Sequence, residues 1–236
     1  MPRCACSLAW LLVLAATVSA RSAMAQTDRD DLLRAWAGAP DTFALDELER
    51  SVDPAGKIAC PKVPLVTHKG THVRYHSPVR VYAGFRPRLE RFEAVVRDVA
   101  IEVYGRAPTR IRHLGTFNCR RIRRWPEFLS EHGLGNAIDV AGFQFAAVQR
   151  KAPVPGDLEP KLRRAFTITV ERNWTAKADD AVLSRHSRFL QTLATRLVAR
   201  HDIFRVLLGP AYPGHHNHFH FDCAPWRLVH VFEQGA

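Results

Sequence analysis

The sequence predicts an α+β fold in which helices pack on a mainly antiparallel sheet. Two observations support this expectation. Several short apolar stretches have the two-residue period of a strand and are separated by long connections, and two longer stretches have the spacing of an amphipathic helix. The composition, with 47% apolar and 24% charged residues, is that of an ordinary globular domain, so disordered and fibrous architectures are not expected.

Residues 1–25 have the pattern of a secretory signal. Arg3 precedes an apolar stretch from Leu8 to Ala20, which is shorter than the about 20 residues that a membrane span needs. Ala23 and Ala25 offer an A-x-A cleavage site before Gln26, and Ala20 is an alternative position. A buried N-terminal helix is the other interpretation, but the order of charged, apolar and small residues favours a signal. We therefore expect a periplasmic or secreted protein without an integral membrane segment after signal removal.

The remaining length suits one domain with an extension better than two domains. Residues 26–66 are interpreted as an N-terminal extension, because they are polar and interrupted by prolines. Short amphipathic helices are expected within it at 31–37 and 45–51. Residues 67–236 are interpreted as the domain itself.

Period-two alternation predicts three strands in the domain, at 74–81, 109–117 and 166–170. Apolar residues at steps of three and four predict a helix over 89–103 that Pro87 opens and Gly105 closes. The same spacing predicts a second helix at 184–200, and a short apolar stretch predicts a strand at 204–208. The first helix is expected to pack on the sheet.

The chain is basic, with a formal net charge of +11, so anionic partners are expected. For an exported protein this favours a cell-wall polymer or lipid headgroup over nucleic acid. A dense basic run lies at 120–124, although such runs are commonly solvated surface. Three cysteines remain outside the signal, Cys60, Cys119 and Cys223, which permit three pairings of one disulfide in an oxidising compartment.

Four of the twelve histidines lie within residues 215–220, and Asp222 follows. On a strand, His218, His220 and Asp222 share one face, while the two intervening phenylalanines anchor the other. Histidine clusters also occur in affinity tags and in structural hydrogen-bond networks. The alternating phenylalanines argue against a tag.

A second candidate segment runs from Ser130 to Asp139. Gly133 and Gly135 allow a tight turn after His132, so its imidazole and the Asp139 carboxylate can converge. Taken alone, a histidine seven residues before an aspartate is a weak signal. Together with the first segment, however, it completes a set of two nitrogen ligands and one oxygen ligand.

His132, Asp139 and His220 are therefore the candidate ligands of a tetrahedral Zn²⁺ whose fourth position is left to water. Such an open site is typical of catalysis, because zinc lowers the pKa of its water to around 7 and polarises a carbonyl. His218 lies on the same strand face as His220 and is the candidate to accept the proton of the water or to stabilise a tetrahedral intermediate.

The pattern S-x-H-x-x-G-x-A-x-D at Ser130–Asp139, followed by H-x-H at His218–His220, resembles the superfamily of lysostaphin, D-Ala-D-Ala carboxypeptidases and hedgehog domains. With Gly115–Arg120 before it and Leu208–Pro210 after it, the chain looks like the bacterial extensin-like C-terminal domain family. The resemblance covers roughly Ser77 to Asp222. It implies a hedgehog/DD-peptidase-like fold.

The resemblance also implies roles for individual residues. His132, Asp139 and His220 match the zinc ligands, His218 the catalytic histidine and His215 a further site residue. Arg120 matches an arginine that lies near the substrate carbonyl in the carboxypeptidases, where a guanidinium suits an oxyanion or a carboxylate. A surface arginine is the other interpretation of Arg120.

This chain departs from its relatives at two places. The carboxypeptidases use a glutamate shortly before the last ligand as general base, and no acidic residue lies between Phe204 and Asp222. The family often has a cysteine where this chain has His201. Cys119 is therefore expected to pair with Cys223 or Cys60, and we favour Cys223 because both cysteines flank the expected site.

Two functions follow as expectations. The first is an exported zinc metallopeptidase that hydrolyses an amide bond in peptidoglycan peptides. The second is a binding module that keeps the fold and recognises peptidoglycan or a related cell-wall polymer without cutting it. The full ligand set favours the enzyme, and the missing glutamate favours the module.

Overall fold

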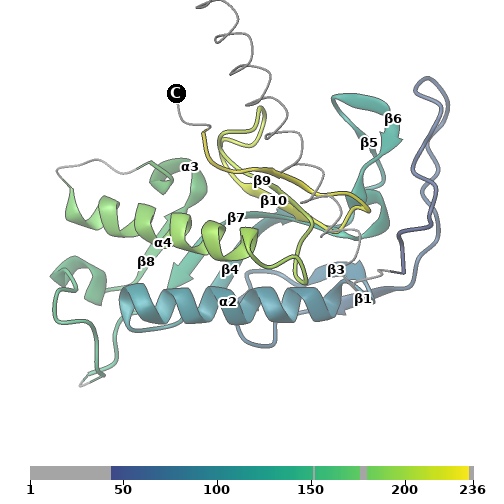
Figure 1. Cartoon of the computed structure of the whole chain (residues 1–236). Coiled ribbons are helices and arrows are strands. Elements are labelled where there is room, and N and C mark those ends of the chain that lie inside the picture. The colour runs from purple at the N-terminus through teal and green to yellow at the C-terminus, as the bar shows by residue number, and fades with distance from the viewer. Residues whose placement is uncertain (1–43, 151, 176–179, 234–236) are drawn as a thin grey trace, which may run out of the picture. The chain divides into compact units, whose positions relative to one another are not determined.

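The computed structural model describes residues 44–150, 152–175 and 180–233 (Figure 1). The expected signal at 1–25 and the expected short helix at 31–37 lie outside these residues. Within the described residues, no helix combines the length and the apolar character that a membrane crossing requires.

A seven-stranded sheet forms the centre of the described unit, with strand order β11-β9-β10-β7-β4-β2 and with β8 also paired to β7. Its strands are β2 (Arg74–Tyr75), β4 (Arg110–Gly115), β7 (Ala137–Phe145), β8 (Phe166–Thr169), β9 (Val206–Leu208), β10 (Phe219–Asp222) and β11 (Leu228–His230). The pairs β2–β4 and β9–β11 are parallel, and the pairs around β7 and β10 are antiparallel. The predicted α+β class with a mainly antiparallel sheet is confirmed.

Two long helices cover one face of this sheet, α2 (Arg86–Tyr104) and α4 (Ala181–Val198) (Figure 1). The predicted apolar stripe of α2 is buried in the core, and Gly105 ends the helix at φ 70°, where its N–H donates to Ile101 O. Asp180 begins α4 by accepting hydrogen bonds from the backbone N–H groups of Val182 and Leu183. Both predicted helices are therefore confirmed, within a few residues at their ends.

Smaller elements complete the described residues: β1 (Leu65–His68) with β3 (Val79–Tyr82), β5 (Arg121–Ile122) with β6 (Trp125–Leu129), α3 (Val170–Asn173), and 3₁₀ helices at Glu131–Leu134 and Pro160–Arg163. The predicted strand at 74–81 is divided between β2 and β3, which belong to different sheets. Pro78 lies in the break and has no N–H to donate to a neighbouring strand.

The helix expected at 45–51 is wrong. Residues 44–48 form turns, and Ser51 makes a β-bridge with Phe128. The guanidinium of Arg50 donates to the carbonyls of Leu45 and Leu48, so side-chain contacts replace the helical hydrogen bonds of this segment.

The expected pairing of Cys119 with Cys223 is also wrong, because the disulfide joins Cys60 to Cys119. Cys119 lies in an exposed loop, whereas Cys223 is fully buried and its thiol donates to Ile203 O at 3.3 Å. The two residues flank the site in sequence but lie in different environments. The disulfide instead attaches the segment before β1 to the loop after β4.

Candidate metal centre

Three elements bring His132, Asp139 and His220 together. Asp139 lies on β7 and His220 lies directly opposite it on the antiparallel strand β10. The 3₁₀ helix at Glu131–Leu134 places His132 above this strand pair. As predicted, Phe219 and Phe221 are fully buried in the core, so His220 faces the other side of the sheet.

Gly135 explains why the chain can turn between His132 and β7. It adopts φ 62°, in the left-handed region that favours glycine. A Cβ at this position would also lie 2.9 Å from the backbone nitrogen of Tyr82, which donates to Gly135 O. A side chain at residue 135 is therefore excluded by both conformation and space.

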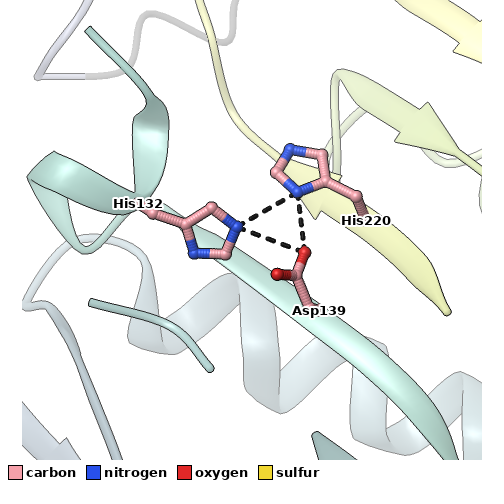
Figure 2. A group of neighbouring side chains, drawn as sticks. All are labelled: His132, Asp139 and His220. Atoms are coloured by element: carbon pink, nitrogen blue, oxygen red, sulfur yellow. Dashed lines mark hydrogen bonds and ion pairs between the residues drawn. The ribbon is translucent and has the colours of Figure 1, made fainter. Parts of the chain in front are cut away.

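The donor atoms of the three residues form a small triangle, and Figure 2 shows all three pointing toward a common centre. His132 Nε2 lies 3.2 Å from Asp139 Oδ1 and 3.2 Å from His220 Nδ1. His220 Nδ1 lies 2.9 Å from Asp139 Oδ1. Tetrahedral zinc with bonds of about 2.0–2.1 Å holds its ligands roughly 3.3 Å apart, so the triangle has the size of a metal site.

The outer nitrogens of both imidazoles are already engaged. His132 Nδ1 donates to Thr116 O at 3.0 Å, and His220 Nε2 donates to Asp222 Oδ2 at 2.7 Å. In these neutral tautomers the inner nitrogens present lone pairs, as does the carboxylate. Three acceptors that face one another need a cation between them. The donor set therefore fits a metal ion.

The pKa values of His220 and Asp139 also indicate that positive charge is stabilised at this site. Burial alone would lower the pKa of His220, but hydrogen bonds with Asp139 and Asp222 raise it to about 10. Burial alone would raise the pKa of Asp139, but hydrogen bonds from His132 and His220 hold it well below its usual range. A proton or a metal ion can supply this charge.

His218 and His215 lie beside the triangle. His218 Nε2 is 3.6 Å from Asp139 Oδ1, and its Nδ1 donates to Asn217 Oδ1 at 2.7 Å. The His215 ring centroid is 4.9 Å from that of His218. Burial lowers the pKa of His218, and burial followed by repulsion from His220 lowers the pKa of His215 to about 4. Both imidazoles are therefore predominantly neutral at pH 7.

Arg120 is not part of this cluster. Its side chain is exposed, and within the described part of the chain no hydrogen bond or ion pair connects it to the three ligands. Its backbone carbonyl does accept a hydrogen bond from Ser130 N at 3.0 Å, which joins its loop to the turn that carries His132.

A buried ion pair supports the site, and the sequence does not reveal it because its two residues lie far apart in the chain. Glu131 precedes His132, and its carboxylate accepts from Arg50 Nε at 2.5 Å and from Asn136 Nδ2 at 2.5 Å. Arg50 and Glu131 are each 4% exposed and lie 81 residues apart in the chain. This pair supports the turn that positions His132.

The chain matches a known protein family over most of its length. Residues 42–230 match the family described as extensin-like protein C-terminus. No curated protein and no solved structure matches the chain.

Proposed function

Because the chain belongs to the family of extensin-like protein C-termini, we propose that it is an exported, zinc-dependent hydrolase that cleaves an amide bond in peptidoglycan peptides. The single observation that supports this best is the triangle of inward-facing acceptors on His132, Asp139 and His220. The proposal includes a hedgehog/DD-peptidase-like fold and a periplasmic or secreted location. The basic charge of the chain suits a cell-wall polymer as partner.

In this proposal His132 Nε2, Asp139 Oδ1 and His220 Nδ1 hold the zinc ion. Zinc supplies Lewis acidity there, which polarises a carbonyl and makes water acidic enough to react near neutral pH. Thr116 O and Asp222 keep the two imidazoles in the tautomers that direct lone pairs inward.

His218 takes the role of general base. Its Nδ1–H is held by Asn217, so its Nε2 carries the free lone pair on the side of Asp139. Burial keeps the imidazole neutral at pH 7, which is the form that can accept a proton from the attacking water. The imidazolium then formed is stabilised by the nearby Asp139 carboxylate. No acidic residue between Phe204 and Asp222 competes for this role.

The two other site residues have narrower roles. His215 packs beside His218 and limits the orientations that this imidazole can adopt. Arg120 is assigned to a substrate carboxylate or to the oxyanion, and this assignment rests on the family resemblance alone.

The test is incubation of purified, metal-analysed protein with peptidoglycan fragments, followed by mass spectrometry. We expect new amine termini with the parent chain and none with His218→Ala, although that variant retains zinc. His216→Ala is the matched control, because His216 is an exposed neighbour, and it should cleave like the parent.

A second function is supported by the missing glutamate of the carboxypeptidases. Here the chain is a module that keeps the metal-site fold and binds cell-wall polymer without cutting it. Unchanged fragments in the same assay, together with retention of the zinc-loaded protein on insoluble peptidoglycan, would support this module and refute the hydrolase.

A further inference from the structure

An exposed segment at 117–128 combines arginines with aromatic side chains. It contains β5 and all but the last residue of β6, two strands that pair only with each other in the described sheets and stand apart from the central sheet (Figure 1). We call it the arginine–aromatic hairpin and define it by five exposed side chains: Phe117, Arg123, Arg124, Trp125 and Phe128.

Three large aromatic side chains of the hairpin are exposed to solvent. Phe117, Trp125 and Phe128 are 39%, 41% and 38% exposed. They are three of the eight large hydrophobic side chains that are exposed among the described residues, and they lie within twelve residues of one another. Apolar groups concentrated on one short segment, with charges between them, mark an interaction surface rather than the scattered exposure of an ordinary surface.

Its arginines are available to an anionic partner. Arg123 and Arg124 are exposed and form no ion pair with another described residue, and the one acidic residue of the segment is Glu127. Arg121 differs from them, because its guanidinium donates to the carbonyls of Asp53 and Gly56 and so fixes the hairpin to the preceding segment.

The hairpin is held in place before any partner binds. The Cys60–Cys119 disulfide attaches its start, and the bridge between Ser51 and Phe128 attaches its end. A surface ordered in advance loses little conformational entropy on binding.

We propose that the arginine–aromatic hairpin docks the protein onto an anionic lipid surface. Guanidinium groups form paired hydrogen bonds with lipid phosphates, and tryptophan and phenylalanine rings settle at the level of the headgroups. A sugar polymer fits less well, because sugar rings stack on uncovered aromatic faces and arginine side chains lie over two of these rings. The Arg80 guanidinium lies over the Phe117 ring at 5.4 Å, and that of Arg124 lies over the Trp125 ring at 6.0 Å.

Docking would also position the metal centre. Asn118 N donates to His132 O, and Ser130 N donates to Arg120 O, each at 3.0 Å, so the base of the hairpin is joined to the ligand turn. The five residues of β6 span about 16 Å. Docking would therefore hold the candidate metal centre close to the membrane, where it could reach cell-wall polymer that lies next to the membrane. The docking itself does not depend on the proposed hydrolysis.

The test is sedimentation with vesicles, using the chain from Gln26 onward so that the expected signal does not itself insert. Vesicles of phosphatidylcholine alone are compared with vesicles containing about a third phosphatidylglycerol. We expect at least about tenfold tighter binding to the anionic vesicles, lost at high salt. Arg123→Ala/Arg124→Ala should weaken this binding about tenfold or more, and Trp125→Ala several-fold.

Matched controls separate the hairpin from general charge and apolarity. Arg163→Ala/Arg164→Ala removes the same charge from exposed residues elsewhere, and Trp226→Ala removes a tryptophan that is 40% exposed. Both should bind like the parent, as should His218→Ala, whatever its hydrolytic activity. Equal binding to the two kinds of vesicle, or equal losses in the control variants, would overturn the proposal. So would hairpin-dependent binding to purified peptidoglycan without binding to vesicles.

Discussion

The two ligand histidines face the metal centre with different ring nitrogens, and their outer hydrogen bonds set that choice. His132 presents Nε2 because its Nδ1 is bound to the carbonyl of Thr116. His220 presents Nδ1 because its Nε2 is bound to Asp222. Each outer partner therefore orients a candidate ligand from outside the triangle of donor atoms. At the residue scale, the site consists of the side chains of His132, Asp139, His220 and Asp222 and the backbone carbonyl of Thr116, with His218 at its edge.

The metal assignment predicts different losses for neighbouring residues. Asp139→Ala and His220→Ala remove a donor from the triangle and should lose stoichiometric zinc. His218→Ala should retain most of it, because His218 lies 3.6 Å from Asp139 and outside the triangle. Metal content of the purified variants, measured by plasma mass spectrometry, checks this order. Equal retention in all three variants would refute the ligand assignment.

The outer partner of His220 gives a finer prediction. Asp222 accepts from His220 with one oxygen and from the N–H of Ala224 with the other. Asp222→Asn leaves one acceptor oxygen for two donors, so the His220 tautomer is no longer fixed. We expect zinc affinity to fall about 10- to 100-fold in a competition titration with a chelating dye. Asp98→Asn, at an exposed position of α2, is the control, and an equal loss there would contradict the prediction.

At the element scale, the turn at Glu131–Leu134 depends on a segment that precedes the sheet. Arg50 neutralises Glu131 in the interior, and Glu131 also binds both the backbone and the side chain of Asn136. The disulfide at Cys60 holds the same segment at a second point. The site is thus completed by residues distant in the chain from its ligands.

This pair predicts a coupled loss of stability. Arg50→Met leaves the Glu131 carboxylate buried without its partner, and should lower the free energy of unfolding by about 3–5 kcal/mol. In a Glu131→Gln background the same change should cost at least about 1 kcal/mol less, because no charge is left unpaired. Urea unfolding of the four proteins measures this coupling. Arg91→Met breaks an exposed ion pair with Asp202 and should cost less than about 1 kcal/mol.

The elements that the sequence predicts are those whose signal is local. Helix α2 has five apolar residues at steps of three and four, with Pro87 and Gly105 at its ends, and its burial follows from that stripe. Asp139 and His220 meet because they lie opposite each other on neighbouring antiparallel strands, where opposite residues point to the same face of the sheet. The turn at 45–51 was not predictable in this way, because Arg50 finds its partner 81 residues away. The disulfide depends likewise on which cysteine the fold buries.

At the scale of the whole molecule, one strand connects the metal centre to the centre of the core. The first half of β7 pairs with β10, which carries His220. The second half pairs with β8, where aromatic rings of α2, β7, β8 and α4 pack together. The register between β4 and β7 shifts between these halves, at Arg112 and His113. The two halves of β7 therefore pack in different surroundings: the first carries the candidate ligand Asp139, and the second lies in the aromatic cluster.

The aromatic cluster contains a buried histidine that makes stability depend on pH. His186 stacks against Phe166 with ring centroids 5.2 Å apart, and its Nδ1 is hydrogen-bonded to the Tyr104 hydroxyl at 2.9 Å. Burial lowers the pKa of His186 to about 4, from 6.5. Because the unfolded chain takes up this proton more readily than the folded one, stability is fully present above pH 6.5. It is lost as the pH falls from 6.5 toward 4.

The size of this effect follows from the two pKa values. At pH 4.5 the uptake of a proton on unfolding should remove about 2–3 kcal/mol from the free energy of unfolding, relative to pH 7. His186→Gln keeps an acceptor for Tyr104 but does not titrate. The stability advantage of the parent over this variant should therefore shrink by that amount between pH 7 and pH 4.5. Urea unfolding with a chelator present, so that metal release does not contribute, measures both curves. Parallel pH dependence of the two proteins would show that His186 is protonated alike in the folded and unfolded chains.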